Sequence, residues 1–543
     1  MQLNYDLFDD KATWEKAGII LPEFDILTMR EATERAPQWV HFGVGNIFRA
    51  YIAALSQRML NMGLTESGIV GIETFDYEII KKVFMPFDNL SLLIGLSADG
   101  SMKKEVIASI AETTCADEEH WEALSDIFRN PKLQMVSFTI TEKGYAVCDS
   151  SGNYLPVAAA DIKRGTGVPN HVMSVAASLM YSRFQAGGAP IALVSMDNCS
   201  KNGDVLRGAI LAIAKGWHFK GFVPKAFIDY LSDESKVSYP WSMIDKITPF
   251  PDESVYRYLT ELGIYRMEPV KTSKNSVTAP FVNAEIPEYL VLEDNFPNSR
   301  PPLEKVGVYM TDREIVGKAE KMKVTTCLNP LHTALAIFGC LLGFTKISDE
   351  MKDPDLVALV NHIGYGEALP VVADPEIISP ENFLKEVLEK RFPNPFIPDT
   401  PQRIATDTSL KIPVRFGETI RAYAKRPDLD VSSLVYIPLV IAGWLRYLLA
   451  VDDEGNEMPL SPDPMLTELC SKLKDIRPGQ PDTLTDQLSS ILSNKAIFGV
   501  DLYEVGLGEK VEEFFRMLIA KPGAVRETLR KHINITETVH KVR

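Results

Sequence analysis

The sequence predicts two domains: an α/β domain built on a mostly parallel sheet, followed by a mostly helical domain. In the first half, short apolar runs alternate with helical patterns, which is typical of a parallel sheet wrapped by helices. After about Met310, long amphipathic helical patterns dominate. A chain of 543 residues is also too long for one ordinary core. We place the boundary just after the proline-rich segment 296–302, which gives domains of residues 1–308 and 309–543.

The elements of both domains can be predicted in chain order. Residues 1–36 are expected to form a helical lead-in, and residues 39–42 the first buried strand. Further strands are predicted at 68–73, 90–96, 133–141 and 191–196, with helices at 48–62, 120–129, 171–184 and 205–217. In the second domain, helices are predicted at 331–342, 380–391, 432–449 and 511–521.

Composition and charge exclude several classes of protein. Hydrophobic residues make up 45% of the chain and charged residues 24%, which is usual for a soluble globular protein. A net charge of −16 without a basic stripe argues against a nucleic-acid surface. The six cysteines are scattered without a C-x-x-C pair, and no apolar run reaches the ~18 residues of a membrane span. We expect a cytoplasmic protein with no membrane or nucleic-acid partner, as a monomer or weak oligomer.

A glycine loop follows the first strand. Gly43 and Gly45 lie between this strand and a helix, where backbone N–H groups can hold a pyrophosphate. The third glycine of the usual fingerprint is missing, since Phe48 or Arg49 occupies that region. Glu73 ends the second strand, where an acid can bind both ribose hydroxyls of NAD. The pattern favours a Rossmann-type dinucleotide-binding domain, although a plain tight turn or the cofactor loop of a methyltransferase can have a similar sequence pattern.

Polar residues also follow the strand at 191–196. Asp197 and Asn198 lie at its carboxyl end, which is where open α/β sheets bind their ligands. An Asp/Asn turn with a helix cap is the common alternative for such a segment. Both interpretations hold together if Asn202 and Gly203 form the turn and Asn198 is the functional amide.

A lysine, an amide and an imidazole come close together at the start of the second domain. Asn329 and His332 are three residues apart, so they share one face if the segment is helical. Lys323 does not stack on them in a straight helix and is expected at its start, reaching over the same pocket. Such a group could abstract a hydroxyl proton, hold an oxyanion and orient a sugar.

Other candidates are less specific by themselves. Asp245 lies in a short apolar run, for which a surface turn is the plain alternative. Arg403 and Lys411 lie in a dense polar segment and could hold polyol oxygens or a substrate carboxylate, although a solvated loop would look the same. The eight histidines do not cluster and no H-E-x-x-H run occurs, so no metal site is predicted.

Taken together, these segments resemble the polyol-specific long-chain dehydrogenases, the mannitol dehydrogenase family. Six segments are similar to family motifs and follow the family order; they are 41–50, 137–145, 195–203, 244–249, 323–332 and 394–411. The spacing of Lys323, Asn329 and His332 is the most specific of these matches. Lys246 stands where the family has Arg, and Tyr289 where many members have Trp. The fructuronate reductase branch is the most similar.

The resemblance implies a fold, a reaction and roles for residues. It implies a Rossmann-type domain, a helical domain and an active site in the cleft between them. The implied reaction is metal-independent hydride transfer with NAD(H), between D-fructuronate and D-mannonate; the alternatives are a mannitol 2-dehydrogenase and a tagaturonate reductase. The residues implied for the cofactor are Gly43, Gly45, Asn46, Phe48, Arg49, Glu73 and Thr141.

The implied catalytic groups come mostly from the second domain. Lys323 would be the general acid/base, with Asn198 and Asn329 holding the developing alkoxide. Glu320 would relay the proton to solvent, and the substrate would be bound by His332, Arg403, Lys411 and Asp245. Two competing hypotheses stay open: a methyltransferase, which leaves Lys323 and its neighbours unexplained, and a catalytically silent sugar-nucleotide binder.

Overall fold

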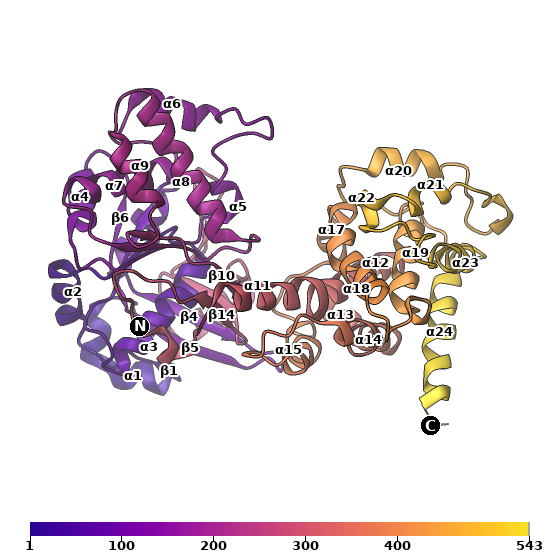
Figure 1. Cartoon of the computed structure of the whole chain (residues 1–543). Coiled ribbons are helices and arrows are strands. Elements are labelled where there is room, and N and C mark those ends of the chain that lie inside the picture. Colours follow the sequence, from indigo (N-terminus) through magenta and orange to yellow (C-terminus); the bar gives the residue numbers. More distant parts are fainter. Residues whose placement is uncertain (541–543) are drawn as a thin grey trace. The chain divides into compact units, whose positions relative to one another are not determined.

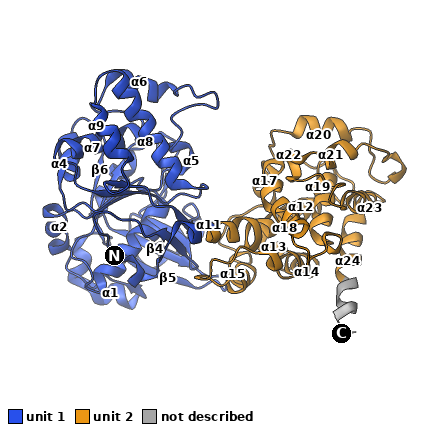
Figure 2. Cartoon of the chain, viewed as in Figure 1, with its two compact units in different colours: residues 1–317 blue, residues 318–543 orange. Residues whose placement is uncertain are grey.

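A computed structural model describes residues 1–540, and for residues 534–540 it describes only the course of helix α24 (Ala524–His540). The chain divides into two compact units, residues 1–317 and 318–543 (Figure 2). The boundary predicted at 308/309 falls just before strand β15 (Tyr309–Thr311), which pairs with β14 (Tyr289–Glu293). This pairing ties the residues after 308 to the first unit.

The centre of the first unit is a six-stranded sheet, ordered β6-β3-β2-β7-β8-β9, in which every pair is parallel. The sheet confirms the predicted parallel arrangement (Figure 1). Its strands are β2 (Trp39–Phe42), β3 (Ile69–Glu73), β6 (Ile110–Cys115), β7 (Met135–Phe138), β8 (Ile191–Ser195) and β9 (Val237–Ser238).

Both faces of this sheet are buried, which explains the continuous apolar runs in its strands. Val40 and Phe42 of β2 face one core cluster, and the alternating residue Trp39 faces another. The first cluster lies under helices gathered on one side of the sheet in Figure 1. These helices are α4 (Trp121–Arg129), α7 (Val172–Gln185), α8 (Asn202–Phe219) and α9 (Lys225–Ser232). The second cluster includes α3 (Ala53–Asn61), which continues a π-helical segment Phe48–Ile52.

One predicted strand belongs to a different sheet. Residues 90–96 were expected in the parallel sheet, but β4 (Ser91–Leu96) lies in a four-stranded mixed sheet ordered β1-β5-β4-β13. Its partner β5 (Met102–Ile107) follows after a short turn and runs antiparallel to it. A turn this short permits only antiparallel pairing, because a parallel neighbour needs a crossover of a dozen or more residues. The other members are β1 (Ile19–Ile20) and β13 (Phe281–Glu285).

A smaller sheet, ordered β10-β14-β15, carries Asp245 at the end of β10 (Ser242–Asp245). The lead-in that was expected to be helical contains α1 (Lys11–Lys16) and α2 (Ile26–Arg35), with β1 between them. Other helices of the first unit are α5 (Thr141–Gly144), α6 (Pro156–Arg164) and α10 (Glu253–Glu261).

The second unit is helical among its described residues, as predicted. Its buried centre is formed by α12 (Asn329–Leu341) and α19 (Tyr436–Tyr447). The helical stretch 313–341 is long and apolar enough to span a membrane, but 78% of its apolar window is buried inside the protein, as in a core helix. Further helices are α13 (Ile347–Glu350), α14 (Pro354–Asn361), α15 (Pro380–Glu386), α16 (Pro401–Ile404), α17 (Thr408–Arg415), α18 (Gly417–Lys425), α20 (Leu466–Leu473), α21 (Ser489–Leu492), α22 (Lys495–Phe498), α23 (Gly508–Leu518) and α24.

Candidate active site

The glycine loop joins β2 to the helical segment that begins at Phe48. Gly43 has a φ of +92°, and a Cβ there would lie 2.3 Å from the backbone oxygen of Thr139, so no other residue fits. A Cβ added at Gly45 would meet nothing within 4 Å. The loop is therefore closed against β7 at Gly43 and open at Gly45. A strand, an open glycine and a helix start fit the pyrophosphate of a dinucleotide.

The missing third glycine has a structural counterpart on the neighbouring strand. In the usual fingerprint that glycine lets the helix pack close to the sheet. Here Phe48 is fully buried, and a Cβ added at Gly71 would lie 3.4 Å from Phe48 Cε1 and 2.8 Å from Val44 Cγ1. The glycine that permits close packing lies on β3 instead of on the helix.

Glu73 lies at the carboxyl end of β3, as predicted for a ribose-binding acid. Its Oε1 accepts hydrogen bonds from the backbone N–H groups of the next three residues, at 2.8–3.2 Å. Its Oε2 accepts a longer bond, 3.4 Å, from Val44 N in the glycine loop. Burial raises the pKa of this carboxyl, and the backbone donors oppose that rise. Oε2 is the oxygen with capacity to accept from a ribose hydroxyl.

Arg49 lies beneath the loop. It is fully buried and donates to Ala279 O at 2.6 Å, Thr278 Oγ1 at 3.0 Å and Asn46 Oδ1 at 2.9 Å. Burial lowers the pKa of this guanidinium to about 10. These bonds fix Asn46 and hold the segment that precedes β13 against the loop.

At the carboxyl ends of β7 and β8, the Asp197 carboxylate holds the loop that follows β7. It accepts from Ile140 N at 2.8 Å, Thr141 N at 3.2 Å and the Tyr145 hydroxyl at 2.7 Å. Thr141 has a φ of +65°, an unusual conformation that these bonds stabilise. Asn198 follows Asp197 directly and is exposed, so it lies at the edge of the sheet where a ligand is expected.

Asn202 is a structural amide that the sequence did not single out beyond a turn. It is 1% exposed, and its Nδ2 lies within hydrogen-bond distance of Ser195 O, Asp197 O and both oxygens of Ser242. Its Oδ1 accepts from Ser242 N at 3.0 Å. The amide joins the end of β8 to β10 and so fixes the base of the Asn198 turn. An Asn-Gly pair after a buried strand was the available signal.

Asp245 is 5% exposed and lies opposite Tyr289 in the β10–β14 pair. The alternative of a surface turn is therefore wrong for this residue. Its neighbour Lys246 forms an ion pair with Glu288 at 2.8 Å, and burial lowers the pKa of that lysine. The acid beside it compensates for the buried ammonium.

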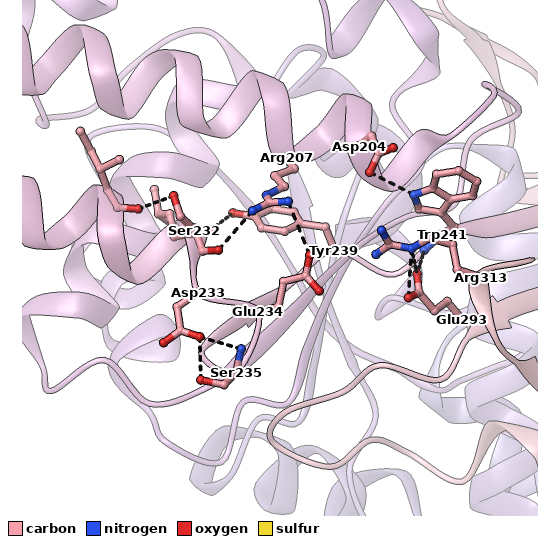
Figure 3. A network of polar contacts seen from close by, with 12 residues as sticks. Asp204, Arg207, Ser232, Asp233, Glu234, Ser235, Tyr239, Trp241, Glu293 and Arg313 are labelled. Atoms are coloured by element: carbon pink, nitrogen blue, oxygen red, sulfur yellow. Dashed lines mark hydrogen bonds and ion pairs between the residues drawn. The ribbon is translucent and has the colours of Figure 1, made fainter.

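Helix α11 (Arg313–Met322) leads to Lys323, and its start is held by the first unit. Figure 3 shows Arg313 beside Trp241 and Glu293. Arg313 Nε lies 3.0 Å from Glu293 Oε2, and its guanidinium lies over the Trp241 ring at 5.4 Å. The Trp241 indole donates to Asp204 Oδ1 of α8 at 3.2 Å. No sequence motif indicated this set of contacts.

Lys323 begins a π-helical segment, Lys323–Cys327, between α11 and α12. Its side chain is 6% exposed. Glu320 precedes it by one turn within α11. Single π-helical turns inside longer helices are frequent at functional sites, because the extra residue re-aims the side chains. Lys323 was expected at the start of the helix that carries Asn329 and His332; it lies instead in the π-helical segment that joins α11 to that helix, six residues before Asn329.

Asn329 and His332 both lie in the first turn of α12, which begins with an Asn-Pro pair suited to a helix start. Their spacing puts them on one face, as expected. Arg415, at the end of α17, donates to Thr333 Oγ1 at 2.6 Å and lies 3.5 Å from Asn329 O. Burial lowers the pKa of Arg415 to about 10.

Arg403 and Lys411 flank the same region of the second unit. Arg403 forms an ion pair with Asp399, whose other oxygen lies 3.3 Å from His332 Nε2. Lys411 donates to the backbone oxygens of Ile404 and Thr406. The pKa of Lys411 is lowered to about 8, first by burial and then by Arg415 and Arg403. Asp399 was overlooked as a site residue, although its i,i+4 spacing to Arg403 was a usable signal.

The two units therefore contribute different chemistry. The first offers an open glycine loop, a carboxylate and an amide at strand ends. The second offers a buried lysine, an amide, an imidazole and cations. No group of three or more metal-ligating side chains occurs among the residues the structure describes.

Known proteins share this organisation. The Mannitol dehydrogenase Rossmann domain family matches residues 37–305, and the Mannitol dehydrogenase C-terminal domain family matches residues 316–518. The D-mannonate oxidoreductase of Thermotoga maritima is 54% identical over 533 residues, 97% of this chain and 98% of that protein. A mannitol 2-dehydrogenase of Aspergillus fumigatus is 30% identical over 511 residues, 91% of this chain and 93% of its own length.

Two solved structures are similar along most of the chain. Pseudomonas fluorescens mannitol 2-dehydrogenase, in a ternary complex with NAD and D-mannitol, has a TM-score of 0.69 at 27% identity and covers 98% of this chain and 100% of its own. A substrate-free D-sorbitol dehydrogenase has a TM-score of 0.78 at 27% identity and covers 94% of this chain and 97% of its own. The chain therefore belongs to the mannitol dehydrogenase family and is an NAD-dependent oxidoreductase.

Proposed function

We propose that this protein is a keto-hexuronate reductase that interconverts D-fructuronate and D-mannonate with NAD(H). The Thermotoga maritima relative named D-mannonate oxidoreductase supports this choice, since it is 54% identical along nearly the whole chain. The mannitol 2-dehydrogenase relatives are about 30% identical, which makes the hexitol reaction the alternative, with tagaturonate reduction as a third. The proposal includes a cytoplasmic location, a small-molecule substrate, and a monomeric or weakly oligomeric state.

The observation that carries the proposal is a group of mutually repelling cations in the second unit. Burial lowers the pKa of the half-buried Lys411 ammonium most, and the charges of Arg415 and Arg403 lower it further. Asp399, Asp407 and Asp463 balance these charges in part. A substrate carboxylate placed here relieves the repulsion, whereas a neutral polyol does not. Lys411 uses two ammonium donors on backbone oxygens, so one of its three protons remains for a ligand.

The candidate cofactor residues bind NADH in this proposal. NADH supplies the hydride when it is bound. Gly43 and Gly45 let the backbone approach the pyrophosphate, and Glu73 accepts from the ribose. Phe48, Asn46 and Arg49 hold the loop in shape from below. Thr141, fixed by Asp197, lies at the strand ends beside Asn198.

Lys323 then acts as general acid in the reduction. Hydride adds to the carbonyl carbon, the C=O bond becomes a C–O⁻, and Lys323 Nζ gives its proton to that oxygen. The amides of Asn198 and Asn329 stabilise the developing alkoxide. Glu320 returns a proton to Lys323 from solvent. His332, Arg403, Lys411 and Asp245 bind or shape the rest of the substrate.

The deciding experiment follows NADH oxidation by absorbance with fructuronate, tagaturonate and fructose, and NAD reduction with mannitol. We expect turnover with fructuronate to exceed that with fructose by roughly 100-fold or more, since the carboxylate adds charged hydrogen bonds. A preference for tagaturonate would keep the uronate assignment and change only the stereochemistry of the assigned substrate. Preference for fructose and mannitol contradicts the uronate assignment.

A further inference from the structure

We propose that Asp399 is a positioning residue with two effects. It makes His332 a hydrogen-bond acceptor for a substrate hydroxyl, and it orients Arg403 toward the substrate carboxylate next to that hydroxyl. This inference rests on the proposed function and adds a specificity rule to it. The substrate end that this pair recognises carries a hydroxyl donor close to an anion, as at the acid end of a hexuronate. A hexitol lacks the anion.

The geometry gives Asp399 one oxygen for each partner. Its side chain is only 13% exposed. Oδ2 lies 3.3 Å from His332 Nε2, and Oδ1 forms an ion pair with Arg403, four residues further along the chain. His332 Nε2 is buried, and its 3.3 Å contact with Asp399 is an electrostatic contact without the geometry of a hydrogen bond; Nε2 forms no hydrogen bond among the described residues. The two substrate-binding candidates are therefore joined by one carboxylate.

An ionised carboxylate beside Nε2 decides which ring nitrogen carries the proton. The carboxylate accepts only, so Nε2 must be the N–H and Nδ1 keeps its lone pair. Burial lowers the pKa of His332, and Asp399 opposes that change, so the ring is neutral near pH 7. A neutral ring with an Nδ1 lone pair accepts from a hydroxyl. The charged groups that act on His332 are Asp399, Arg403 and Arg415.

Asp399 remains ionised in spite of its burial. Burial alone raises its pKa, but the polar contact and charge of His332 and the charge of Arg403 outweigh it, and the net pKa is lowered. Arg403 itself is 61% exposed, and a long exposed side chain loses much rotamer entropy when it binds a ligand. The ion pair with Asp399 restricts the guanidinium before the substrate arrives, and its remaining N–H donors are available for a carboxylate.

The first test is the tautomer of His332 in the unaltered protein. Nitrogen-15 labelling of the histidines and heteronuclear NMR distinguish an Nε2–H ring from an Nδ1–H ring, and His332→Gln identifies the signal. We expect the Nε2–H tautomer at pH 7. An Nδ1–H tautomer overturns the proposal, whatever the variants do.

The second test is Asp399→Asn, with Asp355→Asn as the matched control. Asp355 accepts from Arg526 at 2.8 Å and Arg530 at 2.9 Å, and is 15% exposed, but it pairs α14 with α24 and touches no candidate site residue. In Asp399→Asn the amide can either donate to Nε2 or accept from it, so the ring is no longer restricted to the Nε2–H tautomer. We expect kcat/KM for the keto-hexuronate to fall roughly 10- to 100-fold, as for a lost charged hydrogen bond, with NADH affinity unchanged.

The outcomes distinguish failure of the positioning role from failure of the proposed function. Asp399→Asn with unchanged kcat/KM and an unchanged tautomer overturns the positioning role. An equal loss in Asp355→Asn means that the effect is general destabilisation, and it also overturns the role. If the unaltered protein reduces no uronate, the proposed function fails, while the tautomer measurement still decides what Asp399 does to His332.

Discussion

The candidate functional residues are held in place by different means in the two halves of the chain. In the first unit, the backbone fixes the functional groups: Asp197 is bound by the N–H groups of Ile140 and Thr141, and Glu73 by those of residues 74–76. In the second unit, side-chain charges fix them: Asp399 lies between His332 and Arg403. Backbone donors are present whatever the side chains are, whereas ion pairs depend on each partner and on pH.

This difference indicates where specificity can change. A cofactor site built from strand ends and backbone groups tolerates substitution nearby, because the sheet sets its geometry. A substrate site built from paired charges can be retuned by one residue, because removing one partner leaves the other uncompensated. Members of one family can therefore share a cofactor domain and differ in substrate.

The largest effect is expected from Lys323→Ala in the second unit. Removal of the proposed general acid should lower kcat by roughly 100- to 10,000-fold, with NADH affinity nearly intact, since in the proposed mechanism the lysine acts on the substrate and not on the cofactor. Steady-state kinetics and NADH fluorescence titration measure the two quantities. Lys321→Ala is the control, because Lys321 is half-exposed and lies 3.5 Å from Glu418 at the surface. Full activity in Lys323→Ala would assign the proton to another group.

The next largest effect is expected in the pH dependence of uronate binding, which tests Lys411 of the charged half. Burial lowers the pKa of Lys411 to about 8, so the proposed contact between its ammonium and the substrate carboxylate is present below pH 8 and is lost as pH rises through that value. KM for fructuronate should therefore rise above pH 8, while KM for fructose does not. Lys411→Met should raise the uronate KM roughly tenfold at pH 7 and abolish its pH dependence.

Lys390→Met is the control for this variant, because Lys390 is exposed and pairs with Glu386 at 3.7 Å. A uronate KM that is flat from pH 7 to 9.5 in the unaltered protein would remove Lys411 from the carboxylate site. The uronate assignment itself would then rest on Arg403 and Arg415.

The sequence indicated both halves by residue position: polar residues after apolar runs marked the backbone-held half, and the spacing of Lys323, Asn329 and His332 marked the charged half, while the family resemblance implied the individual roles. Gly43, Glu73 and Asp197 stand at strand ends, and a strand end is visible as an apolar run followed by polar residues. The role of Gly71 in packing Phe48 was not visible, because the contact joins residues from two elements. The bridging role of Asp399 was missed for the same reason, since His332 is 67 positions away along the chain. Strand β4 was assigned to the wrong sheet because periodicity identifies a strand but not its partners.

The smallest effect is expected from Tyr145→Phe in the backbone-held half. The hydroxyl donates to Asp197 at 2.7 Å, but two backbone N–H groups keep the carboxylate in place without it. We expect kcat/KM to fall only about fivefold, since one hydrogen bond contributes about 1 kcal/mol. Burial raises the pKa of Asp197 and the Tyr145 hydrogen bond opposes that rise, so loss of this bond should raise the pKa further and move the acid limb of the activity profile to higher pH. Tyr154→Phe is the control, because that hydroxyl donates to Ala212 O at the surface. A loss as large as that of Lys323→Ala would show that a side chain, and not the backbone, holds this loop, and the contrast between the two halves would fail.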